Sequence, residues 1–325
     1  TAASAMLIAT TAHAAPPADI DAFAQHVLEA FETPGMSIAI VERGQPTVLR
    51  SYGVRRMGQP AQVDENTLFA IGSTTKAFTS ATLATLVDEG KLTWDTRVSD
   101  VLPGFKLQDA YASSEMTVRD LLVHRSGLGL GAGDLLFYPP PSDRTRAEIV
   151  HSLRYIKPAS SFRSTFAYSN MMYLVAGEVI KAVGGASWEE AVRQRIFAPL
   201  QMTSSTTSSL LPAGANRAWP HSRITTDMRG DGPVVALAAP VDIDIVGPSG
   251  SIQSSTADIA RWLELQLGRG LDPRTNKRVF SEAQAREMWT PQMVVPVAPN
   301  PRGLELAQAA YKAYGLGWSV SDYRG

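Results

Sequence analysis

The sequence predicts a mixed α/β protein of the α+β type, in which an antiparallel sheet is flanked by helices and joined to a helical lobe. Residues 36–41 and 47–54 have the apolar character of strands and enclose a turn at residues 42–45. Helical patterns then dominate from residue 76 to about 267, and strand character returns only at residues 314–320. Strands near both ends indicate one antiparallel sheet whose middle is interrupted by a helical region.

The helices follow from apolar periodicity and from glycine at their ends. Residues 20–31 predict an amphipathic helix before the first strand. Residues 77–89 stop at Gly90, and residues 171–183 stop at Gly184, because glycine is favoured just past a helix C-terminus. Further helices are predicted at residues 118–123, 147–155, 188–196 and 257–267.

The first residues predict export. Residues 2–12 form a short apolar run of small side chains, and Ala12-His13-Ala14 resembles a signal-peptide cleavage site. The run is too short to span a bilayer, and an ordinary apolar N-terminal helix is the alternative. We expect residues 1–14 to be a partial signal peptide and the protein to be periplasmic or secreted. Residues 15–325 then form one domain, with a sheet lobe at 20–70 and 305–325 and a helical lobe at about 71–304.

Composition excludes several function classes. A chain of 325 residues with 44% hydrophobic residues can bury a large core. The formal charge of −1 gives no electrostatic reason to bind nucleic acid or an anionic membrane. No cysteine is present, the histidines show no metal-ligand spacing, and no phosphate-binding glycine motif precedes a helix. We therefore expect no metal, no cofactor and no nucleic-acid partner.

The most informative stretch is Ser73-Thr74-Thr75-Lys76, at the start of the helix of residues 77–89. Residues three apart lie on the same helix face, so the Lys76 amine can reach the Ser73 hydroxyl. A serine at a helix N-terminus also lies at the positive end of the helix dipole, which favours a developing oxyanion. Ser73 is thus a candidate nucleophile and Lys76 its candidate base. Alone, this spacing also occurs by chance.

Tyr168-Ser169-Asn170 supplies a second element just before the helix of residues 171–183. A serine hydroxyl is a poor nucleophile until a base takes its proton, and a lysine does so only when its pKa is lowered. The Tyr168 phenol could share that role, and the Asn170 amide could hold Lys76 or a substrate carbonyl. Taken singly, Tyr168 is equally a lip tyrosine and Asn170 a helix N-cap.

These segments together resemble the serine β-lactamase and penicillin-binding-protein superfamily, on the branch of class C β-lactamases, family VIII carboxylesterases and D-aminopeptidases. The likeness extends from about Phe23 to Trp318. Besides the two motifs, it includes Gly90-Lys91-Leu92 with Asp95 and Val98, residues 117–128 and residues 250–262. The resemblance implies a β-lactamase/transpeptidase-like fold with the active site between the two lobes.

One family element is not found in this sequence. The resemblance implies a third motif, Lys-Thr-Gly or His-x-Gly, on a strand that supplies one N–H of the oxyanion hole. Neither sequence occurs, although residues 314–318 are similar to the strand just before it. We therefore expect the chain to be C-terminally incomplete, without the last strands and the closing helix. That arrangement would leave an exposed sheet edge and an uncovered apolar face.

Three further residues are predicted near the site in supporting or substrate-binding roles. A Ser-His-Asp triad is unfavoured, because only His124 lies in a segment that we place near the site, and there it more simply holds a turn by hydrogen bonds. Ser249 and Gly250 lie in a predicted tight loop beside the cleft, which lacks the second glycine of a G-x-S-x-G motif. The loops of residues 127–141 and 213–248 are candidates for specificity, and Phe137 and Tyr138 form either an acyl-group wall or ordinary lobe packing.

The sequence thus predicts an exported serine hydrolase that forms an acyl-enzyme on Ser73. A carboxylesterase acting on short acyl esters is the first choice, and a β-lactamase or a peptidase for D-residue peptides is the alternative. A non-catalytic β-lactam-binding or sensor protein is the alternative of another class. The expected partners are small-molecule esters, β-lactams or D-peptides, with no membrane-spanning segment.

Overall fold

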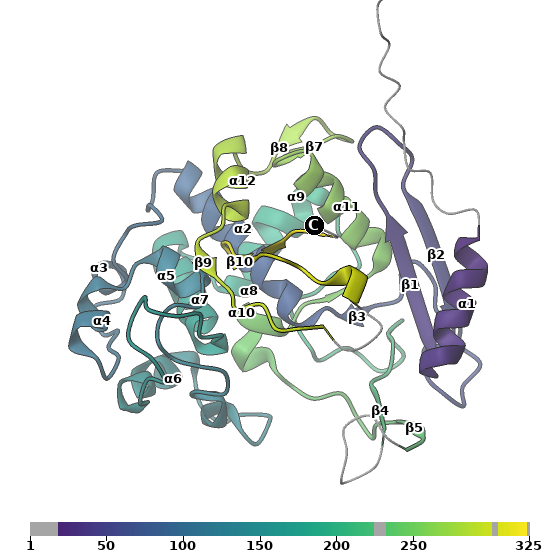
Figure 1. The fold of residues 1–325 in the computed structure, drawn as a ribbon, viewed down its shortest axis with the longest axis horizontal. Coiled ribbons are helices and arrows are strands. Elements are labelled where there is room, and N and C mark those ends of the chain that lie inside the picture. Colours follow the sequence, from purple (N-terminus) through teal and green to yellow (C-terminus); the bar gives the residue numbers. More distant parts are fainter. Residues whose placement is uncertain (1–18, 224–231, 301–304, 324–325) are drawn as a thin grey trace, which may run out of the picture.

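A computed structural model describes residues 19–223, 232–300 and 305–323. Its first elements are helix α1 (Ile20–Phe31) and the antiparallel hairpin of β1 (Gly35–Ile40) and β2 (Val48–Gly53). α1 buries Ala24 and Leu28 and lies along β2 at one edge of the molecule (Figure 1). The predicted helix and hairpin are confirmed, with strand ends shifted by about one residue. The predicted signal peptide lies outside the described residues.

Helix α2 (Thr75–Asp88) forms the centre of the molecule (Figure 1). Every side chain from Thr75 to Leu86 is buried, including the threonines and Lys76. A helix that is buried on all sides needs partners all round, and α2 contacts α7, α8, α10 and α12. It is preceded by strand β3 (Phe69–Ala70) and the 3-10 turn η1 (Gly72–Thr74). The nucleophile motif therefore enters the core directly from a strand.

The helical lobe confirms the predicted helices between residues 118 and 183, and caps explain several of their starts. Thr117 and Thr145 each begin a helix with a capping box, a reciprocal pair of hydrogen bonds between side chains and backbone. The predicted helix at residues 188–196 instead divides into an α-helix, a π-helical turn η4 (Arg193–Phe197) and a last short helix. The lobe contains α3 (Val98–Val101), α4 (Ala110–Glu115), α5 (Val118–Leu122), η2 (Asp134–Phe137), α6 (Arg146–Ser152), η3 (Leu153–Tyr155), α7 (Asn170–Gly184), α8 (Trp188–Val192) and α9 (Ala198–Leu200).

The strands differ most from expectation. The prediction that strand character returns only at residues 314–320 is wrong, because further strands occur before this segment. The segment itself contains the end of one strand and the start of another, joined by a turn in which Gly317 has φ +83°. In the described residues the strands form five small antiparallel sheets instead of one. The additional strands are β4 (His221–Arg223), β5 (Val234–Ala236), β6 (Gln253–Ser254), β7 (Leu271–Asp272), β8 (Lys277–Arg278), β9 (Met293–Val294), β10 (Lys312–Tyr314) and β11 (Ser319–Ser321). Most have two or three residues, too few for their side-chain alternation to be recognised in sequence.

The remaining helices close the core around α2. They are η5 (Asp244–Val246), α10 (Gly247–Gly250), α11 (Thr256–Leu267), α12 (Glu282–Trp289) and η6 (Glu305–Ala307). Trp262 of α11 stacks on Phe78 of α2 with ring centres 4.1 Å apart. This packing confirms the predicted helix at residues 257–267.

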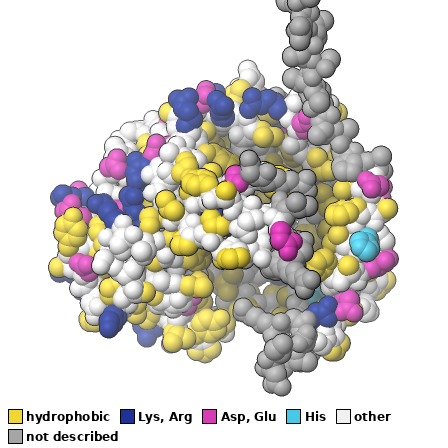
Figure 2. All heavy atoms as spheres, in the orientation of Figure 1, with side chains coloured by type: hydrophobic (Ala, Val, Ile, Leu, Met, Phe, Trp, Pro, Cys, Tyr) yellow, Lys and Arg dark blue, Asp and Glu magenta, His cyan; other side chains and the backbone are white. Residues whose placement is uncertain are grey.

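Hydrophobic side chains gather on the face formed by α12, β9 and β10 (Figure 2). Trp289, Val294 and Val297 are among the exposed apolar residues. Within the described residues, β1 pairs only with β2 and β11 only with β10, so each has one unpaired edge. Among the described residues, these two strand edges are unpaired and apolar side chains are exposed on this face. Among the described residues, none of the helices combines the length and apolarity needed to cross a bilayer.

Candidate active site

Ser73 is presented to solvent by the short turn between a paired strand and the central helix. β3 pairs with β6, and the Ile71 N–H donates to the Ile252 carbonyl at 3.1 Å, which fixes the backbone just before η1. Ser73 then lies in η1, two residues before α2 begins, and its side chain is exposed. An exposed hydroxyl beside the positive end of a helix is well placed to attack a carbonyl carbon.

Lys76 lies beneath Ser73 and is fully buried. Its Nζ donates to Ser73 Oγ at 3.1 Å, to Asn170 Oδ1 at 3.0 Å and to the Ser249 carbonyl at 2.9 Å. These three acceptors match the three donors of an ammonium group, so the amine is held in one place. Burial lowers the pKa of the Lys76 amine to about 7, and the carboxylate of Asp134 opposes that shift.

Tyr168 approaches Ser73 from the segment before α7. Its Oη donates to Ser73 Oγ at 2.7 Å, and its ring centre lies 4.8 Å from Lys76 Nζ. Burial raises the pKa of the Tyr168 phenol, so the hydroxyl keeps its proton near neutral pH and acts as a donor. The structure therefore brings the two predicted partners of Ser73 to the same oxygen from two different segments.

Asn170 is the first residue of α7. The N-cap position belongs to Ser169, whose side chain makes no capping hydrogen bond. The Asn170 amide is thus used on Lys76 and not on the helix end. The N-cap alternative for Asn170 is therefore wrong, and its contact with Lys76 is the one that the other prediction requires.

His124 supports Tyr168 without reaching Ser73. It is fully buried with φ +59°, and its Nδ1 accepts the Ser169 N–H at 3.0 Å. Its ring stacks on the Tyr168 ring with centres 4.2 Å apart. Burial and the charge of Lys76 lower the pKa of His124 to about 3, so the imidazole is neutral. The structure places His124 where it holds the tyrosine segment, which is the supporting role expected from the sequence.

Ser249 and Gly250 lie in the helical turn α10, where the sequence predicted a loop. The Ser249 hydroxyl is buried and donates to the Val246 carbonyl at 2.7 Å, so it is not directed at a substrate. It is the Ser249 backbone carbonyl that binds Lys76. Gly250 packs behind Gly72, the residue before the candidate nucleophile. Both residues therefore act through the backbone.

Three neighbours of the site were missed by the sequence analysis. Asp134 influences the pKa of both Lys76 and Tyr168, although it lies in the loop considered only for specificity. The Tyr173 ring centre lies 5.2 Å from Lys76 Nζ, and the Tyr314 ring centre lies 4.6 Å from that of His124. Tyr173 could have been found, because it lies one helical turn after Asn170 on the same face. Tyr314 comes from β10, in the segment that resembles the strand before the third motif, but no pattern singled out its side chain.

The two aromatic residues considered for an acyl-group wall differ in environment. Phe137 is partly buried against the helical-lobe core, whereas Tyr138 is exposed. Their ring centres are 5.2 Å apart. Lobe packing therefore accounts for Phe137, and Tyr138 is the one available to a ligand.

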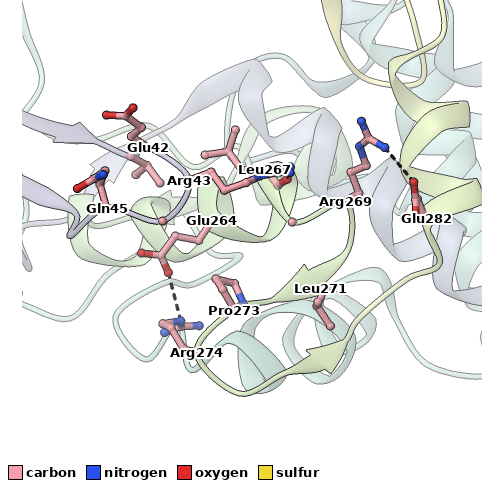
Figure 3. A pocket seen from close by; sticks show the side chains of 13 residues that line it. Glu42, Arg43, Gln45, Glu264, Leu267, Arg269, Leu271, Pro273, Arg274 and Glu282 are labelled. Carbon is pink, nitrogen blue, oxygen red and sulfur yellow. Dashed lines mark hydrogen bonds and ion pairs between the residues drawn. The ribbon is translucent and has the colours of Figure 1, made fainter. Parts of the chain in front are cut away.

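A cavity of about 620 Å³ lies apart from Ser73, between the β1–β2 turn and the end of α11 (Figure 3). Four of its charged side chains form ion pairs, Arg274 with Glu264 at 3.3 Å and Arg269 with Glu282 at 2.9 Å. None of the predicted site residues lines it. In the described part of the chain, no three acidic, histidine or cysteine side chains form a metal-binding group.

The fold is that of the serine β-lactamase and penicillin-binding-protein-like superfamily. The family model described as Beta-lactamase matches residues 20–325, and the chain belongs to that family.

Two curated relatives are similar over nearly the whole chain. Penicillin-binding protein 4 of Amycolatopsis lactamdurans is 31% identical, over 90% of this chain and 72% of its own length. Unguisins hydrolase ungD' of Aspergillus campestris is 30% identical, over 98% of this chain but only 58% of its own length. The octameric penicillin-binding protein homologue from Pyrococcus abyssi has a TM-score of 0.73, with 24% identity over 93% of this chain and 64% of that chain. This last likeness supports the fold alone.

Proposed function

We propose that this protein is an acyl-transfer serine hydrolase in which Ser73 forms a covalent acyl-enzyme. The observation that carries the proposal is the position of Ser73 Oγ, 3.1 Å from Lys76 Nζ and 2.7 Å from Tyr168 Oη. An amine and a phenol at one exposed hydroxyl supply both a base and an acid for acyl transfer.

The environments of the two groups assign their roles. A pKa of about 7 leaves roughly half of the Lys76 amines neutral at neutral pH, and a neutral amine can accept the Ser73 proton. Ser73 Oγ then bonds to the substrate carbonyl carbon. Tyr168 keeps its proton, donates it to the departing oxygen or nitrogen, and regains one from the Lys76 ammonium. The bond to the leaving group breaks and the acyl-enzyme remains.

Deacylation uses the same groups in the reverse sense. A water molecule gives its proton to the neutral Lys76 and attacks the acyl carbon, and Ser73 regains its proton as the acid departs. Asn170 and the Ser249 carbonyl keep the amine in place through both steps. The positive end of α2 favours the oxyanion formed in each step.

Short acyl esters are the proposed substrates, because Ser73 is exposed and the nearby loop of residues 127–141 offers apolar side chains such as Tyr138. Amide substrates, including β-lactams and D-residue peptides, are the second candidate. The similarity to a penicillin-binding protein favours this second candidate. We also propose export, from the apolar run of residues 2–12 and the Ala12-His13-Ala14 sequence that resembles a cleavage site. Fusing residues 1–14 to a reporter that is active only after export would test this proposal.

The test compares p-nitrophenyl butyrate, nitrocefin and a D-alanyl p-nitroanilide as substrates, with intact-mass measurement of the protein beside each assay. We expect ester turnover and a transient acyl adduct, both lost in Ser73→Ala. Ser164→Ala is the matched control, because this serine lies in an exposed loop and bonds only to the Ser161 carbonyl. Full ester activity in Ser73→Ala would contradict the assigned nucleophile. A stable adduct without turnover would favour a β-lactam-binding protein.

A further inference from the structure

Another cleft, of about 410 Å³, lies between the chain that follows β2 and the segment that precedes β4. Three arginines line it, Arg55, Arg56 and Arg217. The other lining residues are Trp219, Gln59 and small or apolar residues, so neither aspartate nor glutamate of the described residues lines the cleft. The cleft is therefore positively charged and is large enough for a small organic molecule.

Arg217 is a half-buried cation with few partners. Among the described residues its buried Nε has no hydrogen-bond partner, and a terminal nitrogen lies at the long distance of 3.5 Å from the Ser209 carbonyl. No carboxylate of the described residues forms an ion pair with it, and burial lowers the pKa of its guanidinium. A desolvated cation without a counter-ion is unfavourable, so an anion in the cleft would be stabilising.

The backbone holds Arg217 in this place. The Leu68 N–H donates to the Asn216 carbonyl and the Ala218 N–H donates to the Leu68 carbonyl, each at 2.8 Å. Arg217 thus lies beside Leu68, directly before β3 and the turn that presents Ser73. This pairing fixes the backbone from which the Arg217 side chain enters the cleft.

Neutral groups position the other two arginines. Arg55 donates to Asn216 Oδ1 at 2.8 Å, and the Arg56 guanidinium lies 4.4 Å over the Trp219 ring centre. The carboxylate of Asp64 belongs to the same network but is separated from Arg55 by Asn216. It accepts hydrogen bonds from the Asn216 amide nitrogen at 2.9 and 3.0 Å. The positive charges in the cleft are therefore oriented without being neutralised.

We propose that this arginine cleft binds a small anionic ligand through a carboxylate or phosphate group. Guanidinium groups present paired N–H donors that match the oxygens of such anions, and three of them converge here. The anion could be an arm of the substrate, since the cleft borders the strand leading to Ser73, or a free effector. The two sources share one chemistry and differ in their effect on catalysis.

The binding test uses inorganic phosphate and the Ser73→Ala protein, so that its outcome is independent of hydrolytic activity. Calorimetric titration at constant ionic strength should show binding that is roughly tenfold weaker in Arg217→Gln, with Arg56→Gln as a second variant if the first folds poorly. Arg144→Gln is the matched control, because Arg144 is exposed and lies outside the cleft. Absence of binding, or equal affinity in both cleft variants, overturns the proposal.

The source of the anion is distinguished with two esters, p-nitrophenyl butyrate and the singly charged mono-p-nitrophenyl glutarate. If the anion is part of the substrate, the ratio of kcat/KM for glutarate over butyrate falls roughly tenfold in Arg217→Gln, and phosphate competes with the glutarate ester. If the anion is a free effector, phosphate binding weakens in the variant while the ratio is unchanged. An unchanged ratio together with unchanged phosphate affinity refutes an anion site of either kind.

Discussion

Replacing Lys76 with methionine should change how the free energy of unfolding depends on pH. The buried amine has a pKa of about 7 in the folded protein, against 10.5 as the ordinary value expected in the unfolded chain. Between these values the unfolded chain binds more protons, so stability rises with pH. The destabilisation due to Lys76 is therefore complete below pH 7 and absent above 10.5. Lys76→Met removes this dependence while retaining an unbranched side chain that favours helix.

The size of the effect follows from the difference between the two pKa values. The difference, 10.5 − 7, is about 3.5 pKa units, which at about 1.36 kcal/mol per unit corresponds to roughly 5 kcal/mol below pH 7. Between about pH 7 and pH 9, the wild-type protein should regain roughly 2 kcal/mol relative to Lys76→Met. The three hydrogen bonds of Nζ offset part of the absolute cost but do not alter the sign of the slope.

Urea unfolding of both proteins across this pH range measures the difference directly. Lys181→Met is the control, because it removes an ammonium group from an exposed position on α7. Ester hydrolysis gives an independent check: a neutral Lys76 is required, so kcat/KM should fall as the pH drops below about 7. Stability curves that stay parallel for wild type and Lys76→Met would refute the reasoning, since the buried amine would then titrate as in the unfolded chain.

Three further outcomes test the surroundings of this amine. Tyr168→Phe removes the 2.7 Å hydrogen bond to Ser73 and should lower kcat/KM for p-nitrophenyl butyrate by roughly 10²–10⁴-fold. A smaller loss would show that the phenol does not act as the general acid. His124→Ala removes the ring stacked on Tyr168, so kcat should fall more than KM rises, whereas a purely structural role would lower only the melting temperature. Gly317→Ala should lower the free energy of unfolding, measured in urea titrations, by roughly 1–3 kcal/mol. The reasons are that Gly317 has φ +83° and that the new Cβ would lie 2.9 Å from the Lys76 carbonyl oxygen. A variant as stable as the wild type would contradict this packing.

Local patterns predicted the elements whose causes are local. The helix at residues 20–31, the first hairpin and the helices of residues 77–89 and 171–183 follow from periodicity and glycine-marked ends, and the structure contains each of them. The proximity of Ser73 and Lys76 was predictable for the same reason, since residues three apart share a helix face.

Contacts between distant segments were less accessible. The short strands were missed, because a ladder of two residues, such as β3 with β6, leaves no alternating pattern in the sequence. The link from Tyr168 to Ser73 was expected only from two motifs considered together. Asp134 carried no sequence signal, and for Tyr314 the sequence indicated only its strand. The place of both side chains beside the site depends on how a loop and β10 pack against the helical lobe.

The sequence by itself determined the family, the candidate nucleophile and its neighbouring amine, because these depend on residue identity and on spacing within one helical turn. Only the tertiary structure decided the state of that amine, since enclosure of α2 by surrounding helices removes Lys76 from water and shifts its pKa towards neutrality. The arginine cleft arises in the same way. Residues 55 and 217 share one surface because Leu68 pairs with Arg217 and the Trp219 N–H donates to the Arg55 carbonyl, and charge brought together by folding has no signature in a linear sequence.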